Sequence, residues 1–164
     1  MKFFTINLSK RKEIEMRAIY FDMDGTIANL YGFENWLDYL LSSDTKPYLN
    51  CAPLVNPKSF IKVISRLKAK GYTVGVISWG AKGGTNEYTR KVKAAKVEWL
   101  NKWFGDIFSE IHVVKYGTSK HSCAKIKNSI LVDDNSDVRK MWRGWTIDAS
   151  NCEEMMNTLA QLAA

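Results

Sequence analysis

The chain has 164 residues, of which 46% are hydrophobic and 12% aromatic, a composition that excludes a wholly disordered protein and suits one domain with a hydrophobic core. An excess of 24 Lys and Arg over 17 Asp and Glu gives a formal charge of +7, which favours anionic partners without choosing between phosphates, nucleotides and nucleic acid. No apolar run reaches the roughly 18 residues of a membrane-spanning helix, and residues 1–16 lack the apolar core of a secretory signal, so we expect a cytoplasmic protein with no membrane partner.

The cysteines and histidines give no pattern typical of a metal site. Cys51, Cys123 and Cys152 are widely spaced and odd in number, which argues against both a disulfide framework and a zinc site. We therefore interpret them as buried or incidental thiols. The two histidines, His112 and His121, are too isolated to form a metal cluster.

The first predicted strand covers residues 18–22 and is almost wholly apolar. Residues 1–17 are expected to form an N-terminal arm or an extra strand, and residues 18–164 a single core domain. Residues 28–57 differ from the rest of the chain, since they are rich in aromatic residues and contain all three prolines. We interpret this segment as an insertion with one helix, over residues 33–41.

Four further strands alternate with helices after the insertion. The strands are predicted at residues 72–78, 111–114, 130–133 and, less clearly, 145–148. The helices are predicted at residues 60–70, 85–104, from 119 or 120 to 127, and 152–162. Thr85 is expected to cap the second of these helices, and Gly71 to end the first. This alternation predicts an α/β fold with a mainly parallel sheet flanked by helices.

Polar side chains follow four of the predicted strands. They are Asp22 and Asp24 after the first strand, Ser78 at the end of the second, Lys115 and Lys120 after the third, and Asp133, Asp134 and Asp137 after the fourth. In an open parallel sheet, ligands bind outside the carboxyl ends of the strands. We therefore expect these groups to meet along one edge of the sheet.

These residue types suit phosphoryl transfer. Carboxylates after the first and fourth strands would hold Mg²⁺, a hard cation that prefers oxygen ligands. A carboxylate at Asp22 can attack phosphorus to form an aspartyl-phosphate, and Asp24 can protonate the leaving oxygen and later activate water. Ser78 can donate a hydrogen bond to a phosphoryl oxygen, and a lysine can neutralise its charge.

The sequence after the first strand resembles the first motif of the haloacid dehalogenase (HAD) superfamily, Asp22-Met23-Asp24-Gly25-Thr26. Residues 76–78 are similar to its second motif, Lys120 can serve as its third, and residues 132–134 look like its fourth. The resemblance extends over roughly residues 18–148. It implies a Rossmann-like core with a small cap insertion at about residues 28–57. It also implies a phosphatase, because the dehalogenases of the family lack the second aspartate, here Asp24.

The resemblance further implies a role for each matching residue. Asp22 is the expected nucleophile and Asp24 the expected acid/base. Thr26 supports the turn and is grouped with Ser78 and Lys120 as the phosphate-binding set. The expected Mg²⁺ ligands are Asp22, the backbone carbonyl of Asp24, and Asp134.

Two of these assignments have competitors. Lys115 directly follows the third strand and competes with Lys120, which we prefer because residues 117–119 precede it like a helix cap and a helix N-terminus favours anions. Asp133 is either a further metal ligand or a partner of the ligands. Asp137 lies closer to Asp134 than the commonest family spacing, and its role is doubtful.

The expected substrate is a small phosphorylated molecule, with nucleotides among the candidates. The combination of a short insertion with Asp133-Asp134 is similar to the 5′(3′)-deoxyribonucleotidase branch of the HAD superfamily. Residues 111–120 are similar to small bacterial and phage-type members of the superfamily. The insertion's aromatic residues either stack on a nucleobase or pack the insertion onto the core: Tyr31, Trp36, Tyr39 and Tyr48. We expect a monomer or a homodimer.

An alternative function comes from the basic charge and the six tryptophans, namely a nucleic-acid-binding or nucleic-acid-end-processing protein on the same fold. The basic residues gather at 58–70, 82–102 and 115–127, which we interpret mainly as solvated helix faces. Since the chain has no zinc-finger, helix-turn-helix or RNA-recognition signature, nucleic acid is the less favoured partner.

Overall fold

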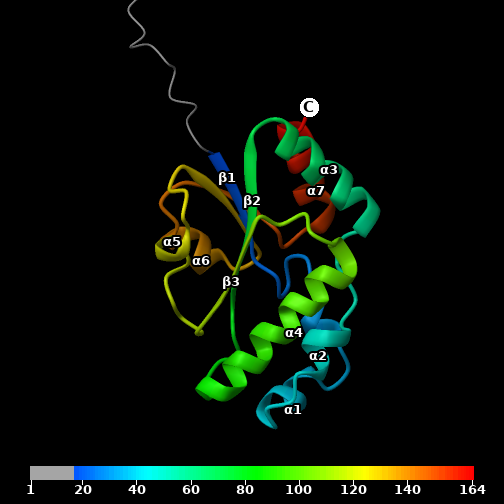
Figure 1. Cartoon of the computed structure of the whole chain (residues 1–164), viewed down its shortest axis with the longest axis vertical. Coiled ribbons are helices and arrows are strands. Elements are labelled where there is room, and N and C mark those ends of the chain that lie inside the picture. The colour runs from blue at the N-terminus through cyan, green and yellow to red at the C-terminus, as the bar shows by residue number, and fades with distance from the viewer. Residues whose placement is uncertain (1–16) are drawn as a thin grey trace, which may run out of the picture.

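The computed structural model describes residues 17–164, so the expectation of an arm or strand over the preceding residues lies outside the described part of the chain. Five parallel strands form one sheet in the order β3-β2-β1-β4-β5, with β1 at its centre (Figure 1). Their bounds are Arg17–Phe21 (β1), Tyr72–Trp79 (β2), Glu110–Val114 (β3), Ser129–Asp133 (β4) and Trp145–Asp148 (β5). The predicted α/β class and parallel sheet are confirmed, and each predicted strand lies within one residue of the observed one.

Helices cover both faces of the sheet (Figure 1). One face carries α3 (Pro57–Ala69), α4 (Asn86–Phe104) and α7 (Cys152–Leu162), and the other α5 (Lys120–Cys123) and α6 (Ser136–Met141). The side chains of β1 alternate between two cores. Ile19 and Phe21 pack in a cluster with Phe60 of α3, whereas Tyr20 packs against Trp142 on the opposite face. Burial on both faces explains why β1 is apolar throughout.

Capping side chains fix where the two longest helices begin. Asn56 accepts a hydrogen bond from the backbone N–H of Ser59 at the start of α3. Thr85 accepts one from the N–H of Tyr88 at the start of α4, so the cap predicted there is confirmed. Helix α3 ends at Ala69, just before Gly71, whose φ of +88° suits a residue without Cβ.

The shorter helices differ from the prediction. The helix expected to reach residue 127 ends at Cys123, because Ala124 has an extended backbone and is buried beside Trp142. Of the helix predicted over residues 33–41, only Trp36–Leu41 is α-helical (α1), and Asn35 before it has a φ of 55°. Helices α2 (Lys46–Asn50) and α6 were not predicted, since five or six residues are too few for helical periodicity to be recognised.

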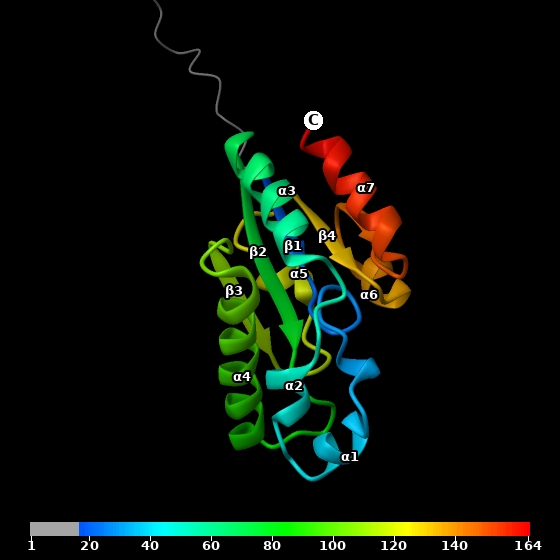
Figure 2. The same ribbon diagram turned by 90° about the vertical axis from the view of Figure 1, so that its right-hand side faces the viewer.

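Residues 28–57 lie beyond the carboxyl ends of the strands (Figure 2). They contain the 3-10 turn η1 (Leu30–Gly32) together with α1 and α2. Two hydrogen bonds fasten this segment to α4: the Tyr88 hydroxyl donates to the carbonyl of Asp44 and the Trp99 indole N–H to that of Cys51, both at 2.8 Å. Throughout residues 17–164, every helix is too short or too polar to cross a bilayer.

Candidate functional site

The site begins where the central strands β1 and β4 end side by side. Phe21 of β1 lies opposite Val132 of β4, and the N–H of Asp22 donates to the carbonyl of Val132 at 2.9 Å. From β1 the chain continues to β2 and β3 on one side of the sheet, and from β4 it continues to β5 on the other side. The strand order therefore reverses between β1 and β4. Such a switch point is where open α/β sheets bind ligands.

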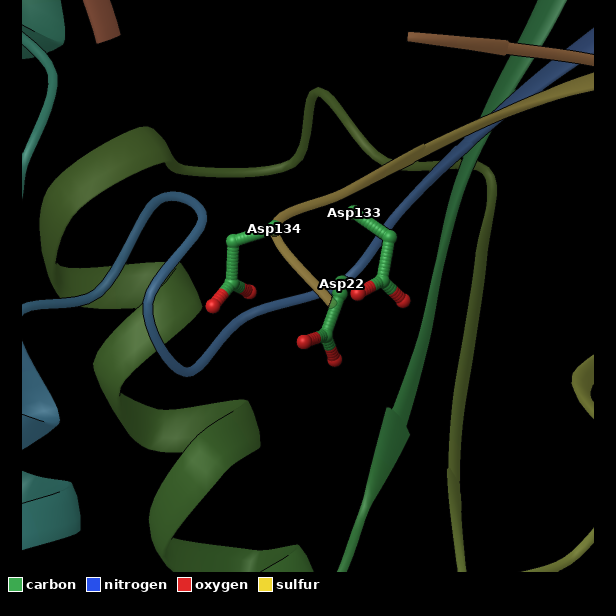
Figure 3. A group of neighbouring side chains, drawn as sticks. All are labelled: Asp22, Asp133 and Asp134. Carbon is green, nitrogen blue, oxygen red and sulfur yellow. The ribbon is translucent and has the colours of Figure 1, made fainter. Parts of the chain in front are cut away.

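Three carboxylates meet at this point (Figure 3). Asp22, Asp133 and Asp134 each offer one oxygen, and these atoms all lie within 4.8 Å of one another. Burial raises the pKa of Asp133 to about 6, and the charge of Asp22 adds to this effect. Burial and Asp22 also raise the pKa of Asp134 above its ordinary value. The cluster therefore holds more negative charge than its buried surroundings stabilise, which is the property of a cation site.

Lys120 is the lysine that reaches these carboxylates. Its ammonium lies 2.8 Å from Oδ1 of Asp22 and 2.7 Å from Oδ2 of Asp133, and the residue is 5% exposed. Burial by itself would lower the pKa of Lys120, but the charges of Asp22 and Asp133 outweigh it and raise the pKa. Lys115 is exposed and takes no part in the cluster.

Thr26 contacts Asp134, the only cluster carboxylate that Lys120 does not pair with among the described ion pairs. Its hydroxyl, fully buried, donates to Oδ1 of Asp134. The turn before it passes so close that a Cβ on Gly25 would lie 2.5 Å from Oδ2 of Asp134. Gly25 has a φ of +81°, a second reason for glycine at this position. Thr26 thus ties the turn after β1 to the side chain of Asp134.

Asp24 and Ser78 are joined by a residue that the sequence analysis missed. The ammonium of Lys96 donates to Oδ2 of Asp24 at 2.7 Å and to Oγ of Ser78 at 2.9 Å. Burial raises the pKa of Asp24 even though the charge of Lys96 opposes the shift. The interpretation of residues 82–102 as a solvated face is therefore wrong at Lys96, which is 1% exposed.

A signal for Lys96 was present in the sequence. It lies four residues after Val92 and three before Trp99, both fully buried on the stripe of α4 that faces the core. A lysine at such a position must have a partner for its charge. Asp137, in contrast, is exposed and pairs with Lys140 at 3.2 Å, outside the cluster.

A cleft of about 340 Å³ opens from the carboxylates towards the insertion. Its outer walls carry aromatic and aliphatic side chains, with a lysine at the rim: Tyr31, Trp36, Leu37, Trp79, Lys82 and Tyr116. Of the aromatic residues singled out in the insertion, Tyr31 and Trp36 stack edge-on with ring centroids 5.1 Å apart. Tyr48 lines the inner wall and is buried, whereas Tyr39 lies outside the cleft against Phe33.

Four carboxylates and one ammonium group line the inner end of the cleft, namely Asp22, Asp24, Asp133, Asp134 and Lys120, and the ammonium of Lys96 contacts Asp24 from the core. When all are ionised, two negative charges remain, which equals the charge of one divalent cation. The arrangement can place such a cation among the carboxylates of Asp22, Asp133 and Asp134. No model of a known protein family and no curated protein matches this chain.

Proposed function

We propose that the protein is a Mg²⁺-dependent phosphomonoesterase of the HAD type that works through an aspartyl-phosphate on Asp22. The observation that carries this proposal is the convergence of Asp22, Asp133 and Asp134 around a common space, with Lys120 bound to two of them. These groups come from segments far apart in the sequence and meet at the switch point of the sheet.

The donor set fits a magnesium ion. All three side chains supply carboxylate oxygens, which hard cations prefer, and the excess of two negative charges calls for a divalent ion. Asp22, Asp134 and the backbone carbonyl of Asp24 would hold the ion, with Asp133 as an additional candidate ligand. When bound, Mg²⁺ would neutralise charge on the phosphoryl group during its transfer.

The chain's own residues divide the chemistry between them. The carboxylate of Asp22 attacks phosphorus and the bond to the ester oxygen breaks, while Asp24 gives that oxygen its proton. Asp24 then takes a proton from the water that hydrolyses the aspartyl-phosphate. The raised pKa of Asp24 supports this role, since a general acid must hold a proton near the operating pH. Lys120 stabilises the transferring charge.

The shape of the cleft supports small organic phosphates as substrates. The phosphate end lies on charged groups, and the outer walls offer aromatic faces on which a planar group can stack. Nucleoside monophosphates have both parts and are therefore the first candidates. The segment of residues 28–57 would act as the cap that selects among them.

The experiment that tests this function is phosphate release from p-nitrophenyl phosphate by the purified protein. We expect release with Mg²⁺, none after EDTA is added, and a loss of at least about 10³-fold in the Asp22→Asn variant. Asp137→Asn is the matched control, because Asp137 is exposed and lies outside the cluster. Full activity in Asp22→Asn would disprove the mechanism.

A screen of nucleoside monophosphates, sugar phosphates and 5′- or 3′-phosphorylated oligonucleotides would then identify the substrate class. Activity confined to oligonucleotide ends would favour the nucleic-acid-processing alternative. Salt-sensitive binding to nucleic acid without any phosphate release would contradict the enzyme altogether.

A further inference from the structure

We propose that Lys96 is a positioning residue that couples the acid/base Asp24 to Ser78, so that its loss impairs leaving-group protonation more than the attack on phosphorus. This inference rests on the proposed function. It concerns a side chain of α4 that lies in the core of the protein and that neither the nucleophile nor the carboxylate cluster contacts in the described ion pairs.

The three N–H groups of Lys96 match three acceptors. The ammonium lies 2.7 Å from Oδ2 of Asp24, 2.9 Å from Oγ of Ser78 and 2.7 Å from the backbone carbonyl of Trp79. An ammonium has three donors and no acceptor, so this set saturates it. Lys96 therefore has no hydrogen left for a substrate phosphate and can act only through the groups that it holds.

Its surroundings hold Lys96 in this arrangement. The residue is 1% exposed, its neighbours Val92 and Trp99 on the same helix are fully buried, and its ammonium lies 5.1 Å from the ring centroid of Tyr48. A long side chain packed in this way has little freedom left, and three charge-assisted or polar hydrogen bonds compensate its buried charge. The ammonium is thus a fixed point between the ends of β1 and β2.

One consequence follows for the reacting groups. Because Oδ2 of Asp24 is held by Lys96, the proton for the leaving group is left to Oδ1 of the same carboxyl. Oγ of Ser78, which is fully buried and outside the lining of the cleft, accepts from Lys96 and so anchors the ammonium that holds Asp24. Lys96 therefore sets the geometry of the acid, with Ser78 as its anchor.

Two substrates of similar shape separate this role from a general structural one. p-Nitrophenyl phosphate has a leaving group that needs little protonation, whereas 4-nitrobenzyl phosphate releases an alkoxide that needs a proton. In Lys96→Met, which removes the charge and keeps the length, we expect kcat/KM to fall at least about tenfold more for the benzyl ester. Lys93→Met, exposed on the same helix, should change neither rate.

A double-mutant cycle with Asp24→Asn tests the route of the effect. If Lys96 acts through Asp24, adding Lys96→Met to Asp24→Asn should cost less than about twofold on the benzyl ester, since the acid is already absent. If the loss in the double mutant instead equals the product of the two single-mutant losses, the inference is overturned. Equal losses on both esters in Lys96→Met would also overturn it. If circular dichroism shows that Lys96→Met does not fold, Lys96→Arg, which keeps the charge, replaces it in the assay. We again expect a larger fall in kcat/KM for the benzyl ester than for p-nitrophenyl phosphate. Equal falls for the two esters would overturn the inference.

The cycle also separates this inference from the function on which it rests. No release from either ester by the wild-type protein would overturn both. A different outcome is phosphate release by the wild type that is abolished in Asp22→Asn, together with equal losses on both esters in the Lys96 variants. That outcome would support the proposed function and overturn only the role of Lys96.

Discussion

Thr26 and Asp134 contact each other through two hydrogen bonds. The Thr26 hydroxyl donates to Oδ1 of Asp134 at 3.0 Å and accepts from the backbone N–H of Asp134 at 3.2 Å. The pair joins residues 108 positions apart and ties the turn after β1 to the loop after β4. Since the side chain of Asp134 is one wall of the carboxylate cluster, this contact sets the geometry of the proposed metal site.

Replacing Thr26 by valine keeps the shape of the side chain and removes both hydrogen bonds. We expect the free energy of unfolding to fall by about 1–3 kcal/mol, because the half-buried carboxylate of Asp134 loses its hydrogen-bond donor. We also expect a higher Mg²⁺ concentration for half-maximal phosphatase activity. Urea denaturation and a Mg²⁺ titration measure the two effects. Thr158→Val is the control, since the hydroxyl of Thr158 only bonds the carbonyl of Glu154 on the surface of α7. An unchanged Mg²⁺ requirement would show that the contact does not position Asp134.

Gly25→Ala combines two separable penalties. A positive φ costs a residue with Cβ about 1–2 kcal/mol, and at Gly25 the Cβ would also lie 2.5 Å from Oδ2 of Asp134. Gly83 has a φ of +70° with no atom within 4 Å of its Cβ position, so Gly83→Ala bears the first penalty alone. We expect both variants to lose stability in thermal unfolding. Only Gly25→Ala should lose Mg²⁺-dependent activity, and equal activity in the two variants would contradict the close approach.

Lys120→Met should lower kcat by about 10²–10³-fold, the usual effect of removing one group that stabilises transition-state charge. Lys115→Met, on an exposed side chain five positions earlier, should leave the rate within about twofold. Initial rates at saturating substrate measure both. The reverse ranking would move the phosphate-binding role to Lys115. Circular dichroism must accompany the assay, because Lys120→Met leaves Asp133 buried without its counter-ion.

His121 gives a pH dependence away from the catalytic groups. Its ring packs edge-on against Trp142 with centroids 4.9 Å apart, and burial, followed by the charges of Lys127 and Arg143, lowers its pKa below 6.5. The unfolded chain therefore binds this proton more readily than the folded one, so the contribution of His121 to stability is lost as the pH falls below 6.5. An NMR titration of the His121 ring should give a midpoint below 6.5.

The same shift should appear in unfolding experiments. Between pH 7.5 and pH 5.5, the wild type should lose more stability than His121→Gln. Taking the difference between the two proteins removes the opposite contribution of Asp133, whose raised pKa makes stability fall as the pH rises. A midpoint at or above 6.5 for His121, or equal losses in the two proteins, would contradict the packing against Trp142.

The sequence predicts most of this fold because strong local patterns agree with the tertiary structure. The strand at Trp145–Asp148 was predicted less clearly than the others, because only Ile147 of its four residues is buried and Trp145 is 84% exposed. Helix α6 was missed because six residues show no period, and because its start depends on Asn135, whose side chain accepts from the N–H of Asp137. Short elements depend on caps rather than on periodicity.

The candidate site was predictable at the ends of strands and at the start of a helix, where Lys120 begins α5, but not in the middle of the long helix α4. Asp22, Ser78 and Asp134 follow apolar runs, so the topology of a parallel sheet brings them together. Lys96 stands among other basic residues on α4, where a charge usually faces water. Its place on the apolar stripe of α4 signals an inward position, and the three-dimensional packing identifies Asp24 as its partner.

The central place of β1 in the sheet has a consequence for the growing polypeptide. Asp22 and Asp24 leave the ribosome before Lys120 and the whole of β4, which follow roughly a hundred residues later. Before that point, β1 can pair with β2 on one side only, and the aspartates of its end stay in water. The proposed cation and phosphate sites are therefore complete only once Lys120 and β4 are in place beside β1.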